Sequence, residues 1–219
     1  MPKIASPPSI ASIALLLACL LALVRPAWSG VYEDILVAAR DNRTDLVVDL
    51  VRRGLDPNTS DPSGTTLLMY AASNGNDALI DFLLRNRANV LKYNQYGDTA
   101  LALAALRGYP AIVRRLLDAG ADLTGPGWSA LHYAAFAGQL EVMRLLLARK
   151  LDLDRRAPNR QTALMLAARH GHRQVVELLI EADADMDLTD ADGQSAMSLA
   201  RKSGNTEIAD YLKRQGAVE

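Results

Sequence analysis

One short segment recurs along the chain at a nearly fixed period. The copies are GTTLLMYAASNG from Gly64, GDTALALAALRG from Gly97, GWSALHYAAFAG from Gly127, RQTALMLAARHG from Arg160 and GQSAMSLARKSG from Gly193. The successive spacings are 33, 30, 33 and 33 residues. A period of this length is typical of a solenoid, in which each unit packs only on its neighbours. The repeat therefore constrains the fold more than the composition does.

Each copy carries the start and stop signals of a short helix. The third residue of each copy carries a hydroxyl, which can accept a hydrogen bond from the free N–H groups of a helix N-terminus. A glycine follows nine residues later, where a positive φ ends the helix and lets the chain reverse. The hydroxyl residues are Thr66, Thr99, Ser129, Thr162 and Ser195, and the glycines are Gly75, Gly108, Gly138, Gly171 and Gly204.

A second helix is predicted after each of these glycines. Pro110 fits the first turn of one of them, because that position needs no backbone N–H. Helices of about ten residues are marginal alone in water, so each pair must gain its stability from the next repeat. Paired apolar residues at helical spacing mark the buried faces: Leu79, Ile80, Leu83 and Leu84; Ile112, Val113, Leu116 and Leu117; Val175, Val176, Leu179 and Ile180.

The period and the segment ALHYAA around His132 resemble the ankyrin repeat, whose signature is T-P-L-H-x-A. A degenerate earlier copy runs from Ile35 to Asn58. The resemblance implies an all-α ankyrin-repeat solenoid of about six helix-turn-helix repeats with hairpin-like loops. We expect the repeats at 31–60, a degenerate N-terminal cap, then at 61–93, 94–123, 124–156 and 157–189, and at 190–219, a C-terminal cap.

Two departures from the repeat carry expectations of their own. Arg87, Lys150 and Asp183 stand where Gly54, Gly120 and Gly216 end the second helix, which predicts up to about 1–2 kcal/mol of left-handed strain, or a distorted turn, at each. In the last repeat, Arg201 and Lys213 occupy positions that are apolar in other copies. Polar residues there are typical of a terminal repeat whose outer face meets water.

The first 29 residues have the pattern of a secretory signal peptide. An uncharged stretch with an apolar segment, Ile10 to Val24, follows Lys3, and small residues stand at Ala27 and Ser29. We expect cleavage after Ser29 and an ankyrin-repeat domain at 30–219. An uncleaved N-terminal membrane anchor and lipidation at Cys19 are the alternatives.

The expected destination is the bacterial periplasm or the outside of the cell. Cys19 is the one cysteine of the chain and lies within the predicted signal peptide. An exported domain without cysteine must be stable without disulfides, which favours a bacterial envelope over a disulfide-stapled eukaryotic ectodomain.

Neither the histidines nor the acidic residues form a recognisable chemical site. His170 and His172 align with residues of other repeats that could not complete a metal-ligand set, and the resemblance implies that His132 ties loops together. The acidic run from Asp183 to Gly193 lacks the ligand spacing of a calcium loop, so Asp185 is interpreted as a loop aspartate. No catalytic motif is present. We expect no enzyme activity, no cofactor and no metal.

A partner protein is the expected ligand, because the resemblance places recognition positions in the hairpins and at the end of each first helix. Aromatic residues and arginines are enriched at interfaces. The alternative is that the rings only pack against neighbouring hairpins. The candidate residues are Tyr93, Tyr96, Asp98, Arg107, Trp128, Phe136, Arg156, Arg169 and His170.

The short spacing also falls at these candidate residues. The segment LTGPGW, ending at Trp128, replaces a longer hairpin and predicts a notch beside the tryptophan. The formal charge of −1 argues against nucleic acid as partner. We therefore expect a monomeric protein-interaction scaffold of the cell envelope, which contacts membrane only if the signal segment is retained. Support of oxidative-stress defence, by chaperoning or recruiting an enzyme such as catalase, and a secreted effector that binds a host protein are the alternative functions.

Overall fold

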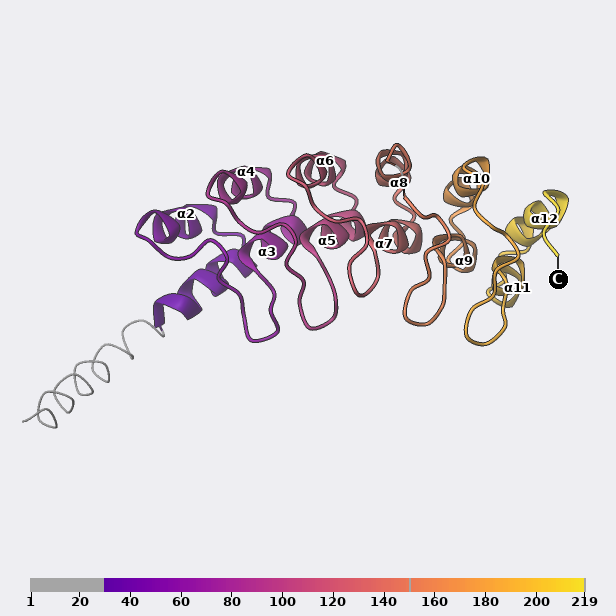
Figure 1. The fold of residues 1–219 in the computed structure, drawn as a ribbon, viewed down its shortest axis with the longest axis horizontal. Coiled ribbons are helices and arrows are strands. Elements are labelled where there is room, and N and C mark those ends of the chain that lie inside the picture. Colours follow the sequence, from indigo (N-terminus) through magenta and orange to yellow (C-terminus); the bar gives the residue numbers. More distant parts are fainter. Residues whose placement is uncertain (1–29, 150, 219) are drawn as a thin grey trace, which may run out of the picture.

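The computed structural model describes residues 30–149 and 151–218, which form a row of stacked helix pairs (Figure 1). Hairpin-like loops project from one side of the row, as Figure 1 shows. The expectation of an all-α repeat solenoid is therefore confirmed. The predicted signal peptide at 1–29 and the predicted strain at Lys150 lie outside the described residues.

The helices form two rows. The inner row lies next to the hairpin loops, and the outer row lies on the far side of it (Figure 1). Within the inner row, α5 packs on α3 and α7, and α9 packs on α7 and α11. The inner row consists of a helix at 30–40, α3 (Leu67–Asn74), α5 (Ala100–Arg107), α7 (Ala130–Ala137), α9 (Ala163–Arg169) and α11 (Ala196–Lys202). The outer row consists of α2 (Thr44–Arg52), α4 (Asp77–Arg85), α6 (Pro110–Asp118), α8 (Leu140–Leu147), α10 (Arg173–Glu181) and α12 (Thr206–Arg214).

The inner helices begin as the repeat predicts. In each of α3, α5, α7, α9 and α11 the hydroxyl of the capping residue accepts from the backbone N–H three residues later. Such a cap contributes about 1 kcal/mol per helix. The glycines at the other end are left-handed, with φ of 70° at Gly75, 73° at Gly108, 69° at Gly138 and 80° at both Gly171 and Gly204.

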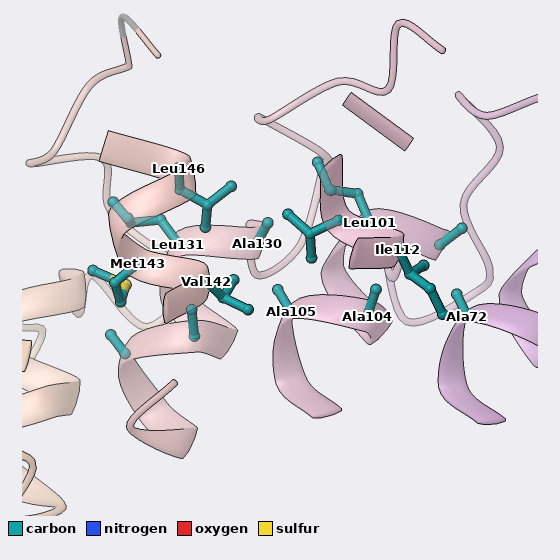
Figure 2. Close-up of a cluster of buried hydrophobic side chains, with 14 of the residues drawn as sticks. Ala72, Leu101, Ala104, Ala105, Ile112, Ala130, Leu131, Val142, Met143 and Leu146 are labelled. Atoms are coloured by element: carbon teal, nitrogen blue, oxygen red, sulfur yellow. The ribbon is translucent and has the colours of Figure 1, made fainter. Parts of the chain in front are cut away.

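The core runs through the stack because small residues let the inner helices approach closely. Ala104 and Ala105 of α5 are 0% exposed. Figure 2 shows them among larger side chains such as Ile112 and Val142 from the outer row. A larger residue at either alanine would force the helices apart, at a typical cost of about 1–3 kcal/mol.

Backbone strain occurs where glycine is replaced. Arg87 has φ of 62° and Asp183 has φ of 66°, as their place in the repeat predicts. Arg160 also has φ of 62°, at the position that Gly64, Gly97 and Gly193 hold in other copies. This third site was not anticipated from the sequence, although the alignment contains it.

A recurring hydrogen bond links outer helices to the preceding repeat. In three repeats the side chain before the outer helix bonds to a backbone carbonyl in the inner helix of the preceding repeat. The imidazole Nε2 of His172, the residue before α10, lies 2.9 Å from the Phe136 carbonyl of the preceding repeat. The amides of Gln139 and Asn205 make the equivalent contact, with the Leu106 carbonyl at 3.2 Å and with the Arg169 carbonyl at 2.8 Å. His172 is therefore a structural residue that performs the task of an amide.

Candidate functional site

Four rings form a continuous aromatic cluster on α7 and α9. Trp128 stands one residue before the N-cap of α7, and its ring centroid lies 5.3 Å from that of Tyr133 and 5.5 Å from that of Phe136. Phe136 also meets His170, at the C-terminal end of α9, edge to face at 4.5 Å. We call Trp128, Tyr133, Phe136 and His170 the aromatic cluster. It brings three predicted site residues together across two repeats.

The aromatic cluster is partly exposed. Phe136 is 36% exposed and His170 is exposed, whereas Trp128 and Tyr133 are half-buried. Trp128 also packs against the hydrophobic core, so its ring both supports the fold and reaches the surface. Burial and the positive charge of Arg169 lower the pKa of His170, which keeps its imidazole uncharged near neutral pH. The cluster therefore presents an uncharged aromatic surface.

Two predicted site residues instead hold the protein together. The Asp98 carboxylate accepts a hydrogen bond of 2.6 Å from the Tyr133 hydroxyl and one of 3.4 Å from the Asn94 amide. Burial, reinforced by the Asp98 carboxylate, raises the pKa of Tyr133. The Arg156 guanidinium donates to the Thr189 carbonyl at 3.1 Å. Both predicted residues thus link neighbouring repeats.

The two tyrosines of the preceding hairpin lie apart from the aromatic cluster. Tyr93 is 58% exposed and Tyr96 is 69% exposed. Among the described residues, neither ring contacts the rings of Trp128 or Phe136. Arg107 and Arg169 end α5 and α9 and are exposed. The predicted site residues therefore divide into a cluster, a separate hairpin, two exposed arginines, and the two residues that link neighbouring repeats, Asp98 and Arg156.

The loop before Trp128 is shorter than its neighbours, as Figure 1 shows between α6 and α7. Arg155, from the next loop, spans this loop by donating to the Thr124 carbonyl at 3.2 Å and the Gly125 carbonyl at 2.9 Å. A surface hollow of about 290 Å³ remains, lined among others by Tyr93, Pro126 and Arg155. Trp128 is not among its lining residues, so this hollow lies on the tyrosine side of the loop, and a notch beside the tryptophan stays a prediction.

Sequence reasoning missed Tyr133 and Arg155. Tyr133 stands at a position that is tyrosine at Tyr70 and leucine at Leu103, Leu166 and Leu199, and that variation was the available signal. Arg155 carried no local signal, because its carbonyl partners lie about one repeat away in the shortened loop.

His132 is a structural residue, as the resemblance implied. It is 1% exposed, its Nδ1 lies 2.6 Å from the Ser129 hydroxyl, and its Nε2 lies 3.0 Å from the Arg155 carbonyl and 3.2 Å from the Gln161 carbonyl. These contacts suit a neutral ring that carries its proton on Nε2. Burial lowers the pKa of His132, which keeps that ring neutral.

Asp185 is a loop aspartate, as predicted. Its carboxylate accepts from the backbone N–H of Asp187 at 2.9 Å, and Asp56, Asp122 and Asp152 cap their own turns in the same way. Within residues 30–149 and 151–218, no group of three or more His, Cys, Asp or Glu side chains is placed to hold a metal ion. No helix in the same residues is long and apolar enough to span a membrane.

A stack of helix pairs with projecting hairpins and a partly exposed aromatic cluster is the architecture of a repeat protein that binds through an extended surface. A family model described as "Ankyrin repeats (3 copies)" matches residues 35–126 and 131–218. The chain belongs to the ankyrin-repeat family. Ankyrin repeats generally mediate protein–protein interaction, which makes a binding scaffold the class of function.

The similar proteins match just over half of this chain. "Neurogenic locus notch homolog protein 1" of Xenopus laevis is 32% identical over 134 residues, which cover 59% of this chain and 5% of that protein. Its human counterpart is 31% identical over the same length. "Glycerophosphocholine phosphodiesterase GDE1" of Candida albicans is 31% identical over 122 residues, or 52% of this chain and 10% of that protein. The chain thus spans a small part of the relatives it matches.

Proposed function

We propose that this protein is a non-catalytic scaffold of the cell envelope that binds another protein through the aromatic cluster. The carrying observation is that Phe136 is exposed and Trp128 is only half-buried near the middle of the stack. Half-buried and exposed rings of this kind supply most of the energy of protein interfaces. Rigid elements beneath them limit the conformational entropy lost on binding.

The test compares capture of a partner by variants of the full chain. Phe136→Ala removes an exposed ring, and Trp128→Ala removes the centre of the cluster. Tyr32→Ala is the matched control, since Tyr32 is 43% exposed on the helix at 30–40, away from the cluster. We expect both cluster variants to lose the partner that wild type and Tyr32→Ala capture from envelope and medium.

A second measurement distinguishes loss of binding from loss of folding. Because Trp128 also packs on the core, Trp128→Ala costs stability, and Phe136→Ala costs less. Circular dichroism and thermal melting establish that each variant is folded. If folded Phe136→Ala and Trp128→Ala both retain the partner, the interface lies elsewhere. Turnover of a substrate by the purified chain would contradict the non-catalytic assignment.

We also propose that the protein is exported and acts as a monomer. The support is the apolar segment Ile10–Val24 and the small residues Ala27 and Ser29, followed by a domain that lacks cysteine. N-terminal sequencing of the exported protein should begin at Gly30. A mature protein that keeps Met1 and resists alkaline extraction from membranes would be anchored instead. Light scattering coupled to gel filtration measures the oligomeric state.

A further inference from the structure

Five arginines in or after outer-row helices are paired with carboxylates of the protein itself. Every ion pair resolved in residues 30–149 and 151–218 joins residues in or directly after outer-row helices, and five arginines take part. The pairs are Arg53 with Asp49, Arg115 with Asp77 and Asp81, Arg144 with Glu141, Arg149 with Asp118, and Arg173 with Glu177.

Three exposed cations of the inner row have no such pair within the described residues. Arg107, Arg169 and Lys202 are exposed, and in the described part of the chain no carboxylate oxygen comes within 4.0 Å of their charged nitrogens. The Lys202 ammonium donates only to the Gln194 amide oxygen, at 3.2 Å. Each of the three is the last residue of its helix. The helix dipole contributes about half a negative charge there, which leaves much of each positive charge unbalanced.

Two of these cations are in register with the aromatic cluster. Phe136, Arg169 and Lys202 each stand seven residues after the capping residue of α7, α9 and α11. These three helices pack successively in the inner row. Phe136, Arg169 and Lys202 therefore form a line across three repeats, which we call the recognition line. Its first residue, Phe136, belongs to the aromatic cluster, and the next two, Arg169 and Lys202, are positively charged.

A hollow lies at the charged end of the recognition line. It has a volume of about 300 Å³, and Arg169 and Lys202 are among its lining residues. Two carboxylates also line it. Asp190 is 5% exposed, and its carboxylate already accepts hydrogen bonds from the backbone N–H groups of Asp192 and Gln194. Asp192 is exposed, so it is the acidic group that a ligand in the hollow would meet.

We propose that the recognition line binds an extended acidic segment of the partner protein. An apolar residue of the segment packs on the aromatic cluster, and two carboxylates pair with Arg169 and Lys202. This inference rests on the proposed function and names the chemistry of the partner. Charge complementarity carries it, because Arg169 and Lys202 line one hollow and neither forms an ion pair within the described residues.

The helix packing sets the spacing of that acidic segment. Neighbouring helices lie about 8–10 Å apart, and an extended chain rises about 3.3 Å per residue. The first carboxylate should therefore stand about three residues from the apolar residue, and the second about six residues from it. A nucleic-acid strand is disfavoured, because its continuous phosphates need a concentrated excess of cations that a chain of net charge −1 lacks.

The experiment selects a displayed library of random peptides on the full chain. We expect the enriched peptides to carry an aromatic or aliphatic residue with Asp or Glu about three and six positions away. One enriched peptide and its Asn/Gln counterpart are then synthesised as probes. Arg169→Glu combined with Lys202→Glu should weaken binding of the acidic probe about tenfold or more, and raised salt should weaken it as well. Asp192→Asn should strengthen it.

A control variant separates local recognition from overall charge. Arg114→Glu makes the same type of change on the exposed side of α6 in the outer row, and it should leave binding of the acidic probe unchanged. Circular dichroism establishes that the reversed variants are folded. Equal weakening by Arg114→Glu and by the double reversal would show only a net-charge effect and would overturn the proposal.

The remaining outcomes distinguish this inference from the proposed function. Enrichment of neutral or basic peptides, or of none, overturns the inference, as does tighter binding of a single-stranded oligonucleotide than of the acidic probe. Peptides that need Phe136 but ignore the charge reversal also overturn it and leave the proposed function intact. Acidic peptides that need Arg169 and Lys202 but ignore Phe136→Ala and Trp128→Ala support the charged half and contradict the proposed centre of the surface.

Discussion

The Tyr133 hydroxyl donates a hydrogen bond of 2.6 Å to the Asp98 carboxylate, although the two residues belong to successive repeats. Tyr133 is also a member of the aromatic cluster, with its ring 5.3 Å from that of Trp128. One side chain thus joins the loop before α5 to the surface of α7. The cluster is held in place by a polar contact as well as by packing.

Tyr133→Phe should destabilise the protein by about 1 kcal/mol, because it removes a hydrogen bond to a carboxylate that is partly shielded from water. Urea unfolding measures this, and Tyr96→Phe, which alters a 69% exposed residue, should have no effect. Burial and the Asp98 carboxylate raise the pKa of Tyr133, so its contribution is complete below pH of about 10 and is lost as pH rises further. The gap between wild type and Tyr133→Phe should therefore narrow at alkaline pH. A constant gap would show that Tyr133 acts through packing alone.

His132 should make the protein sensitive to mild acid. Burial lowers its pKa in the folded state, whereas an unfolded histidine titrates near about 6.5. The stabilisation is therefore present above that pH and is lost as pH falls below it. We expect the free energy of unfolding to drop between pH 7.5 and pH 5.5, and the drop to be smaller in His132→Asn. Equal drops in the two proteins would place the acid sensitivity on other groups.

Arg155 should control the order of the short loop. Arg155→Met removes the hydrogen bonds to the Thr124 and Gly125 carbonyls, so backbone amides of this loop should exchange with deuterium faster. The expected loss of stability is about 1 kcal/mol, since the guanidinium is partly exposed. Arg156→Met is the matched control, because Arg156 bonds to Thr189 in a different loop. Unchanged exchange in Arg155→Met would mean that the loop holds its shape unaided.

Arg87→Gly should stabilise the protein. Arg87 has φ of 62°, which glycine adopts without steric cost, whereas glycine also loses more entropy on folding. The net gain should be at most about 1 kcal/mol, measured as a rise in melting temperature. Gly54→Ala, at φ of 103°, makes the opposite change and should destabilise. A lower melting temperature for Arg87→Gly would show that the arginine side chain makes a favourable contribution that exceeds the strain.

Deletion of 190–219 should expose the core of the preceding repeat. The deleted segment contains α11, which packs on α9, and α12, whose Ile208 and Leu212 are buried. Arg201 and Lys213 lie on the exposed side of the segment and keep that end of the stack polar. We expect partial melting and aggregation, measured by calorimetry and light scattering. A monomeric truncation with the wild-type melting temperature would refute the capping role.

The sequence by itself determined the architecture of this protein. The capping hydroxyls, such as Ser129, and the left-handed glycines, such as Gly138, act within one helix, and their geometry requires only local backbone contacts. The alignment of the repeats predicted the strain at Arg87, and the resemblance to the ankyrin signature implied the loop-tying role of His132. These features were predictable because neighbouring residues in the chain decide them, or because every repeat presents the same surroundings.

Only the tertiary structure decided which variable side chains are available to a partner. Asp98 and Arg156 occupy recognition positions, yet each is bound to a neighbouring repeat about 33 residues away. Phe136 remains partly exposed, and the shortened loop brings Arg155 onto the carbonyls of Thr124 and Gly125. These outcomes depend on the offset between stacked repeats and on which side chain fills the space beside each loop. No local pattern encodes that geometry, because it arises only when the repeats pack.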